Sequence, residues 1–478
     1  MQIAILSGTT TDGGPDIRPS YPRNMVPVVQ ESGISKGYLR PADGIVHLVE
    51  GPGKDRGGIT WNGQHIRVMG GDLVRVNSDA TLTKLGSVPG LDQVTMDYSA
   101  NRIAINGLPA LPGRLAIAAS NLLLYYDGTT VSQVVDPDLG PCKSVTWIDG
   151  YFVSTDGESI VVMDLADPYS VEQLKYGSAE KDPDPIYKMA RVQGELCAIG
   201  RYTIEYFDTI ATEGFPFARI EGAMIPKGAI GSHAACIFGQ TIAFVGGGRN
   251  EPVSIYLGAN GVAQRISTDD IDRVLNAIPS QLLEFVVIEA TTGADQNRIY
   301  VHLPDRTMVY DQSTSQAAGG PIWTTLSSSI QGLAPYRARN FVWQDGRWVV
   351  GDPDGRRLGY LDPTTGHHWG ELVTWEFDTA IIYNEGRGAI VHELELVALT
   401  GRVDLAVDPV IETQWSADGV VWSQPRAIRA GARGETLRRL RWPMQGMLSH
   451  WRIQRFRGSS AAHCSFARLE ATIEALSV

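Results

Sequence analysis

The chain of 478 residues is too long for one ordinary hydrophobic core, and its 43% hydrophobic and 20% charged residues are typical of a globular protein. Its 52 glycines and 26 prolines favour many tight turns between short strands, and runs of the helix formers Ala, Leu, Glu and Lys are nearly absent. A formal net charge of −12 excludes a protein whose whole surface binds nucleic acid, although DNA could still slide through a channel in it. We therefore expect two or three mainly β domains.

The apolar runs and the cysteines of the sequence indicate where the protein is made. The first apolar run is short and has no basic leader, so we expect no signal peptide, and no run of 18 apolar residues predicts a membrane-spanning helix. The four cysteines are far apart and include no Cys-x-x-Cys pair. This spacing favours small buried residues in a reducing cytoplasm over a disulfide framework or a zinc site.

Residues 1–45 are rich in Pro, Gly and Thr and show little hydrophobic periodicity. Such a segment cannot bury a core of its own, so it predicts an extended arm that is ordered only by packing on something else. Its larger apolar residues are the candidates for contact with the rest of the chain or with an adjacent subunit. These interface candidates are Tyr21, Met25, Tyr38 and Leu39.

A repeated unit occupies residues 46–369. Each unit has an apolar strand, a turn of Gly, Asp or Asn, and a second strand that ends in an aromatic or apolar pair before another turn. The second strands are LVRVNSD (73–79), LLLYYDG (122–128), IVVMDLA (160–166), IEYFDTI (204–210), SIYLGAN (254–260), MVYDQST (308–314) and LGYLDPT (358–364). They recur roughly every 38 to 54 residues, which is the spacing of four-stranded propeller blades.

The repeat has a physical explanation. A four-stranded sheet has two apolar faces and cannot bury both alone, so each unit must stack on its neighbours until a ring closes. The first and last of the seven units either share one blade or form two separate ones. Residues 46–369 therefore predict a β-propeller of six or seven four-stranded blades.

One helix is predicted within the propeller, around residues 267–275. Ser267 is its expected cap, two aspartates follow in the first turn, and Ile271, Val274 and Leu275 lie on one face. We expect this helix to connect two blades.

The pattern changes after residue 369. In HELELVAL (392–399) the residues at 394, 396 and 398 face one way and the glutamates at 393 and 395 face the other, which is the alternation of a half-buried strand. Further strands surround a tight turn at Asp418-Gly419. Residues 370–478 therefore predict a β-sandwich that follows the propeller.

The sequence contains no dinucleotide-binding, phosphate-loop, zinc-protease or serine-hydrolase motif. His367-His368 suggests metal binding, but neighbouring strand residues point to opposite faces, so a loop pair is the better interpretation. The Asp-Pro-Asp runs at 182–184 and 352–354 could bind calcium, yet turn formation explains them better. We predict no catalytic residue, no cofactor and no metal site.

Residues 416–422, SADGVVW, are similar to the Asp-box turn of sialidases. That motif is a structural turn even in those enzymes, and here it occurs once and outside the propeller. A sialidase-like propeller protein that binds or cleaves glycans is the alternative function that this motif raises.

Several segments, in the same order along more than 400 residues, resemble the packaged-DNA stabilisation protein, or tail hub, of short-tailed phages of the Salmonella-phage type. The matching positions are Tyr21, Pro22, Asn24, Met25, 35–40, Gly44-Ile45, 203–207, Lys227-Gly228, Gly231, 254–256, 302–304, 309–311, Ser313, Ser315-Gln316, Gly320-Pro321, Trp323, Asp418-Gly419 and Arg438-Arg439. An insertion around 108–113 departs from the family.

This resemblance implies a structural protein of the virion tail, made in the host cytoplasm, and no enzyme. It implies a ring of identical subunits, expected to be six, below the portal and its adaptor protein. The ring would close the DNA exit after packaging and carry the tail needle, spikes or fibres. DNA would pass through the channel without sequence-specific contacts, and no membrane would be bound in the assembled state.

A basic stripe lies in the sandwich, because residues 426–457 contain nine arginines and the single acid Glu435. Pairing of the predicted strands LRRLRW and WRIQRFR would gather guanidiniums on one face, where they need an anionic partner. We favour carboxylates of a neighbouring subunit or of another tail protein over DNA, with a solvated strand face as the simplest alternative. The interface candidates are Arg438, Arg439, Arg441, Arg452, Arg455 and Arg457.

Overall fold

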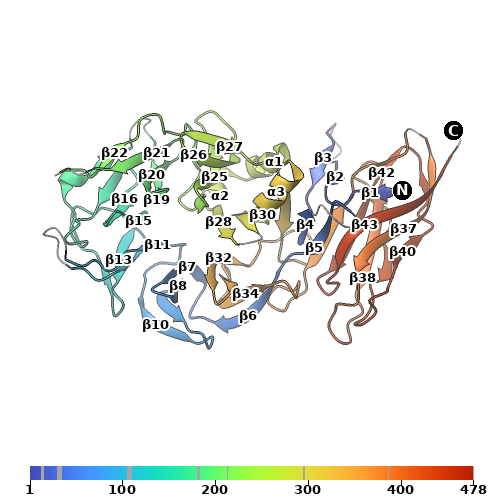
Figure 1. The fold of residues 1–478 in the computed structure, drawn as a ribbon, viewed down its shortest axis with the longest axis horizontal. Coiled ribbons are helices and arrows are strands. Elements are labelled where there is room, and N and C mark those ends of the chain that lie inside the picture. The colour runs from blue at the N-terminus through green and yellow to red at the C-terminus, as the bar shows by residue number, and fades with distance from the viewer. Residues whose placement is uncertain are drawn as a thin grey trace.

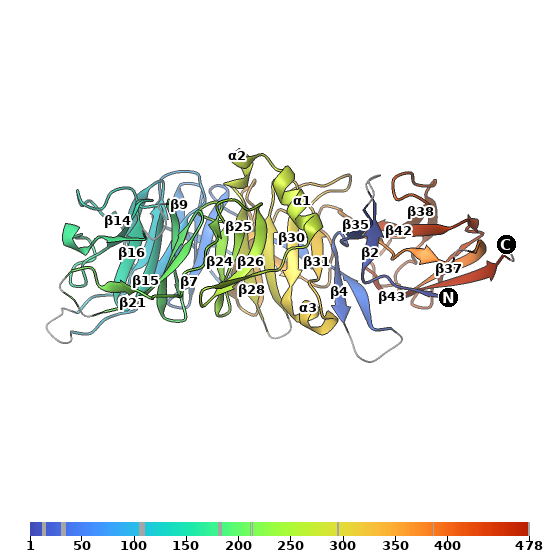
Figure 2. The same ribbon diagram turned by 90° about the horizontal axis from the view of Figure 1, so that it is seen from above.

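Two bodies follow one another along the long axis of the molecule, a ring of small sheets and a two-sheet sandwich (Figure 1). The computed structural model describes residues 1–11, 16–29, 35–104, 110–179, 184–210, 212, 214–293, 296–385 and 387–476. The first and last strands both lie in the sandwich, so the chain leaves the sandwich, builds the ring and returns (Figures 1 and 2).

The ring contains seven sheets within the described residues, each built on a meander of four antiparallel strands. The first blade consists of β7 (Asp55–Trp61), β8 (Gln64–Met69), β9 (Asp72–Val76) and β10 (Leu82–Ser87). The second consists of β11 (Thr95–Tyr98), β12 (Leu115–Ala119), β13 (Leu122–Tyr126) and β14 (Val131–Gln133). The third consists of β15 (Ser144–Ile148), β16 (Tyr151–Thr155), β17 (Ser159–Val162) and β18 (Gly177–Ser178).

The next three blades repeat this arrangement. The fourth consists of β19 (Ile186–Val192), β20 (Glu195–Gly200), β21 (Ile204–Thr209) and β22 (Phe217–Arg219). The fifth consists of β24 (Ala235–Phe238), β25 (Thr241–Gly247), β26 (Ser254–Ala259) and β27 (Val262–Arg265), with β23 (Gly228–Ala229) also paired to β25. The sixth consists of β28 (Val287–Thr292), β29 (Asn297–His302), β30 (Thr307–Asp311) and β31 (Trp323–Leu326).

The seventh blade closes the ring with a strand from the start of the chain. It contains β32 (Arg339–Gln344), β33 (Arg347–Gly351), β34 (Arg357–Asp362) and β6 (Gly44–Glu50), and β6 pairs antiparallel with β34. Each of the seven repeated sequence segments lies on the third strand of its blade, which are β9, β13, β17, β21, β26, β30 and β34. The propeller prediction is therefore confirmed, and the described blades number seven.

Apolar side chains fill the space between neighbouring blades. Ile66, Val68 and Leu73 of the first blade pack against Leu115 and Ile117 of the second, and all five are completely buried. Burial of each such side chain contributes about 1.5–3 kcal/mol relative to exposure, so adjacent blades stabilise one another. This packing explains why continuous apolar strands recur at the spacing of the repeat.

Among the described residues, three α-helices lie in the connections of the propeller. They are α1 (Asp269–Ala277) and α2 (Ser280–Leu283) between the fifth and sixth blades, and α3 (Gln312–Ala318) between β30 and β31, with a short 3-10 turn η1 (Gln173–Lys175) in the third blade. The predicted helix is α1, but Thr268 rather than Ser267 caps it. Ser267 Oγ accepts a hydrogen bond from Ile255 N, at 3.1 Å, and is therefore not available as a cap. No helix among the described residues is long and apolar enough to cross a membrane.

The sandwich consists of two sheets. One contains β4 (Met25–Val29), β5 (Gly37–Pro41), β43 (Ser465–Ala475), β37 (Ala389–Leu399) and β40 (Leu440–Pro443), with β1 (Gln2–Ile3) on β43 and β41 (Met447–Leu448) on β37. The other contains β35 (Thr374–Asp378), β42 (Trp451–Ser459), β38 (Val410–Ser416) and β39 (Arg426–Arg429), with β36 (Ile382–Tyr383) on β42. Leu394 and Leu396 are buried between the sheets, which confirms the predicted alternation in β37.

The prediction that residues 1–45 form an arm without a core was wrong. Strands β1, β4 and β5 belong to the sandwich, and Met25 and Leu39 are fully buried in its core. They are therefore not exposed interface residues. The strands MVPVV and GYLRP are only five residues long and each contains a proline, so their alternation is too short to stand out in the sequence.

A buried polar cluster fastens the first blade to the seventh. Arg67, which is 0% exposed, donates to Asp55 Oδ1 and Oδ2 at 2.8 and 3.0 Å and to the Asn340 carbonyl at 2.7 Å. Asn340 Nδ2 donates back to Asp55 Oδ2. Because Asp55 and Arg67 belong to the first blade and Asn340 to the seventh, this cluster locks the seam where the ring closes.

We expect Asp55→Ala to lower the free energy of unfolding by about 3–5 kcal/mol, because it leaves the buried Arg67 guanidinium without its carboxylate. Urea denaturation measures the loss, and Asp208→Ala is the matched control, since Asp208 is exposed on β21 and its loss is expected to cost under about 0.5 kcal/mol. Equal losses in the two variants would contradict the role of the cluster.

Candidate interaction surfaces at the propeller–sandwich junction

Residues 22–24 join the two bodies through their backbone. The Pro22 carbonyl accepts a hydrogen bond from Thr325 N at 2.9 Å, and Asn24 N donates one to the Thr325 carbonyl at 2.8 Å. Thr325 lies on β31 of the sixth blade. Arg23 N donates a hydrogen bond to the Glu376 carbonyl at 2.8 Å, and the Arg23 carbonyl accepts one from Glu376 N at 3.1 Å. Glu376 lies on β35 of the sandwich. One short stretch is therefore hydrogen-bonded to the propeller on one side and to the sandwich on the other.

The Asn24 side chain adds a second bridge at the same place. Its Nδ2 donates to the carbonyls of Ser327 and Thr374, at 2.9 and 2.7 Å, and its Oδ1 accepts from Ser327 N at 3.0 Å. Asn24 is buried and has a φ of 51°, a left-handed conformation that asparagine tolerates better than most residues. Both the side chain and the backbone conformation thus suit asparagine.

Residues 18–21, called here the N-terminal segment, also contact helix α1. The Tyr21 hydroxyl is hydrogen-bonded to Thr268 Oγ1, and Arg18 Nε lies 3.5 Å from Asp270 Oδ1. Burial raises the pKa of Tyr21 to about 12, against the opposing effect of the Thr268 hydrogen bond, and the aspartates of α1 raise it further. Tyr21 therefore stays protonated at neutral pH and packs against the propeller core, as the sequence predicts for this residue.

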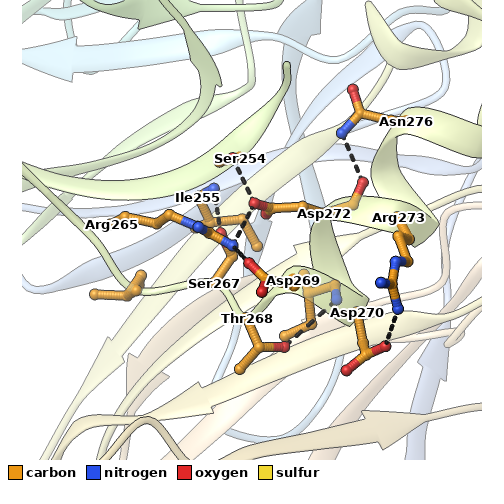
Figure 3. A network of polar contacts seen from close by, with 12 residues as sticks. Ser254, Ile255, Arg265, Ser267, Thr268, Asp269, Asp270, Asp272, Arg273 and Asn276 are labelled. Atoms are coloured by element: carbon orange, nitrogen blue, oxygen red, sulfur yellow. Dashed lines mark hydrogen bonds and ion pairs between the residues drawn. The ribbon is translucent and has the colours of Figure 1, made fainter. Parts of the chain in front are cut away.

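A network of polar contacts holds α1 on the fifth blade (Figure 3). Asp272, on the inner side of the helix, accepts from Ser254 Oγ at 2.7 Å and lies 2.8 Å from Arg265 Nη2. Asn276 Nδ2 donates to the Asp272 carbonyl at 2.7 Å and to the Val253 carbonyl at 3.0 Å. Because these partners come from β26 and β27 or lie next to them, the helix offers the N-terminal segment a fixed surface.

A cleft of about 1090 Å³ lies between the N-terminal segment, α1 and the sandwich. Five arginines and three carboxylates line it, namely Arg18, Arg23, Arg273, Arg306, Arg457, Asp270, Glu376 and Glu412. Burial raises the pKa of Glu376, opposed first by Arg455. The partly exposed side chains of Ile330, Leu333 and Val410 add apolar surface. This mixture suits contact with a protein segment better than chemistry on a small substrate.

The structure separates the arginines that the sequence was expected to gather. β40 and β42 lie in opposite sheets, so the predicted pairing of LRRLRW with WRIQRFR was wrong. Four of these arginines contact carboxylates of their own chain, in the pairs Arg439–Glu395, Arg441–Glu393, Arg455–Asp378 and Arg457–Glu412. Their charge is neutralised across strands of the same sheet, so no neighbouring subunit is needed to balance it.

The remaining two arginines differ from these four and from each other. Arg452 is buried, its Nη1 donates to the Gln445 carbonyl at 2.9 Å, and burial lowers its pKa to about 10. Arg438 is exposed and, among the described residues, contacts no carboxylate. Tyr38 is half-buried on β5. Arg438 and Tyr38 thus stay candidates for contact with a partner.

The positions weighed for metal binding have structural explanations. His368 is buried, and its Nδ1 lies 2.8 Å from Ser328 Oγ, whereas His367 is half-buried. Asp352 contacts Arg337 and Arg357, while residues 182 and 183 of the other Asp-Pro-Asp run lie outside the described residues. Among the described residues no group of three or more His, Cys, Asp or Glu side chains is placed to hold a metal ion.

The Asp418 turn uses its carboxylate for the backbone. Asp418 Oδ1 accepts from Val420 N and Val421 N at 2.9 and 2.8 Å, and Gly419 has a φ of 76°. These contacts are those of a structural turn, in which glycine permits the left-handed conformation. Sequence reasoning identified this turn but assigned no structural role to Asn24, whose partners Ser327 and Thr374 lie 303 and 350 positions away.

These observations define a closed seven-bladed propeller joined to a β-sandwich. Residues 1–366 match the family model described as "Bacteriophage P22 Gp10, beta-propeller", and residues 374–474 match "Bacteriophage P22 Gp10, beta-sandwich". The "Tail hub protein gp10" of Salmonella phage P22 is 28% identical over 382 residues, which are 75% of this chain and 76% of that protein.

The chain therefore belongs to the bacteriophage P22 Gp10 family. It is a structural protein of the phage virion tail and not an enzyme.

Similar solved structures include the computationally designed Ika8 protein, with 13% identity, a TM-score of 0.38 and coverage of 70% of this chain and 96% of that one. The Neurospora crassa Pan2 WD40 domain has 9% identity, a TM-score of 0.40 and coverage of 67% and 96%. These TM-scores are too low to support any argument.

We expect Asn24→Ala to lower the free energy of unfolding by about 2–4 kcal/mol more than Asn62→Ala. Both asparagines have nearly the same positive φ, 51° and 50°, so both substitutions carry a similar backbone penalty. Only Asn24 also loses three buried hydrogen bonds, whereas Asn62 is exposed in the turn between β7 and β8. Denaturant titration followed by tryptophan fluorescence measures the difference, and equal losses would exclude the Asn24 bridge as a stabilising contact.

A pH dependence follows from His368. Burial, with smaller contributions from His367 and Arg23, lowers its pKa from 6.5 to about 3, so below pH 6.5 the unfolded chain takes up a proton that the folded chain does not. The contribution of the neutral His368 to the free energy of unfolding is therefore present at neutral pH and is lost as the pH falls. Between pH 7 and pH 5 the wild type should lose about 2 kcal/mol more than His368→Asn.

Unfolding titrations at the two pH values test this expectation. His47→Asn is the matched control, because His47 is exposed on β6, and it should follow the wild type. A His368→Asn variant with the same pH dependence as the wild type would show that His368 does not stay neutral in the folded state.

Proposed function

We propose that the chain is a tail-hub subunit that forms a ring of six identical copies below the portal and its adaptor protein. The ring closes the DNA exit channel after packaging and docks the tail needle, spikes or fibres. The observation that carries this proposal is the match to both parts of the Gp10 family in the same order, together with a tail hub protein as a relative over three-quarters of the chain.

The fold suits such a role. A closed propeller leaves only short, protected sheet edges, and it offers broad faces to several neighbours. The bridge at residues 22–24 holds the sandwich against the sixth blade, so that contacts made by one body fix the position of the other. A subunit built in this way can transmit the position of the portal to the proteins attached further down the tail.

The charge distribution supports passage of DNA without specific contacts. The net charge is −12, and five of the nine arginines of the basic stripe contact carboxylates of the same chain. Binding to phosphates would require exposed, unpaired cations, and each phosphate contact would slow the movement of DNA. A wall with little positive charge lets DNA slide.

Particles assembled without this chain provide the test. We expect them to lose packaged DNA and to bind no needle, and purified chain added back should restore both, with six copies around the tail axis. Nuclease-accessible DNA per particle and cryo-electron microscopy measure the two results. The Asn24→Ala chain should restore DNA retention less well than the Asn62→Ala control, because its two bodies are less firmly joined.

Two results would contradict the proposal. Particles that lack the chain and still retain their DNA would exclude a role in closing the exit channel. Chain bound to particles as single copies, with no ring around the axis, would exclude the hub.

A further inference from the structure

The connection between β39 and β40 forms an exposed basic loop, defined here as Arg433, Leu437 and Arg438 with the adjoining Arg402. Backbone contacts hold the loop, since Gly434 N donates to the Gly401 carbonyl at 3.1 Å. Gly431 and Gly434 adopt φ values of 106° and 90°, which turn the chain sharply. The backbone is therefore fixed while the side chains of the basic loop extend into solvent.

The basic loop combines unpaired charge with apolar surface. Arg402, Arg433 and Arg438 are exposed and contact no carboxylate among the described residues. They differ in this from the four paired arginines in or next to β40 and β42. Leu437 is 94% exposed between them, and Leu399 beside the loop is 55% exposed. Phosphates of DNA would use the arginines but not the leucines, so this surface suits a protein partner that is anionic and partly apolar.

A complementary surface lies at the other end of the molecule, on the rim of the second and third blades. Residues 127–172 contain nine acids and one base, Lys143, which is the reverse of the nine arginines and one acid in residues 426–457. Val135 and Leu174 protrude from this acidic rim with 84% and 85% exposure. We define the acidic rim by these two residues with Asp136, Asp156, Asp167 and Glu172.

The parts of the acidic rim lie together. Asp136 Oδ2 accepts from Val171 N at 3.1 Å, which brings the segments around Val135 and Leu174 into contact. Burial, and then the carboxylates of Asp138, Asp156 and Asp136, raise the pKa of Tyr176 between them. Asp136, Asp156 and Asp167 accept hydrogen bonds from backbone N–H groups, and among the described residues they form no ion pair with a lysine or arginine. Glu172 differs, because Lys175 lies 3.2 Å from it.

The two surfaces cannot meet within one chain. β14 and β16 lie at one end of the molecule, whereas β37 and β40 lie in the sandwich at the other end (Figures 1 and 2). Two different complementary surfaces on one chain give a head-to-tail contact, which repeats from copy to copy and closes into a ring when the rotation allows. A contact of a surface with itself would instead stop at a dimer.

We propose that the basic loop of one copy docks on the acidic rim of the next copy, with Leu437 packed against Val135 and Leu174. This inference rests on the proposed ring and specifies which surfaces make it. Because part of the attraction is between exposed charges, the contact weakens as salt is added.

Crosslinking between introduced cysteines tests the geometry. The chain's own four cysteines form no disulfide and three of them are buried, so a wild-type chain treated in parallel is a suitable control. Tails isolated from particles that carry Leu437→Cys and Leu174→Cys together, treated with a short bis-maleimide, should give a ladder of covalent multimers. Either substitution alone should give none.

Two outcomes of the crosslinking would overturn the proposal. Intact rings of the double variant that give no ladder would place the two surfaces apart. Dimers from Leu437→Cys alone would indicate that the basic loop contacts the basic loop of a second copy. A wild-type chain that forms no ring in the tail would instead contradict the proposed function, so the two failures can be told apart.

Charge reversal tests the attraction independently. Arg433→Glu with Arg438→Glu should weaken ring assembly by about tenfold or more, and adding Asp167→Arg with Glu172→Arg in the same chain should restore it. Arg356→Glu, on an exposed arginine of the seventh blade, is the control. Charge reversal at either surface alone that leaves assembly unchanged would overturn the proposal. Variants that assemble normally but retain less DNA would also overturn it, because the basic loop would then face the channel.

Discussion

The antiparallel pairing of β6 with β34 closes the propeller, and the rest of the structure depends on this pairing. Because β6 comes from the start of the chain, the seventh blade cannot be completed until the two ends of the propeller segment meet. The residues before β6 and after β34 are thereby brought to the same side, where both enter the sandwich. The propeller is thus inserted between β5 and β35 of the sandwich, and the chain crosses between the two bodies twice. The buried cluster around Arg67 and the bridge at Asn24 then fix the seam and the junction.

Much of this fold could be predicted from the sequence, because its causes are local. Each blade buries two apolar faces, so its third strand recurs as a continuous apolar run that ends in a turn, and β37 shows the strict alternation of a strand with one buried face. The part played by residues 1–45 could not be predicted in the same way. β4 and β5 are short strands that become stable only when β43 lies beside β5, and β43 follows more than 400 residues later.

The functional surfaces show the same division between local and distant causes. The basic stripe is visible in the sequence, but its meaning depends on partners such as Glu395 and Glu393, which lie on β37 more than 40 residues away. These partners neutralise much of the stripe and leave the basic loop as its exposed remainder. The acidic residues of the second and third blades are unremarkable turn formers in the sequence. The fold places them at the opposite end from the sandwich, which the sequence does not indicate (Figure 1).

The proposed hub requires a rigid connection between propeller and sandwich, because such a subunit would hold neighbours, DNA and attached tail proteins in fixed register. Residues 22–24 make that connection with four backbone hydrogen bonds, two to each body. The most direct measurement is hydrogen exchange at the amides of Asn24 and Thr325 in the folded protein. The structure predicts exchange as slow as that of the central strands of the sixth blade, because both amides open only when the junction opens. Exchange at the rate of an unstructured peptide would contradict it, and would mean that the propeller and the sandwich move independently.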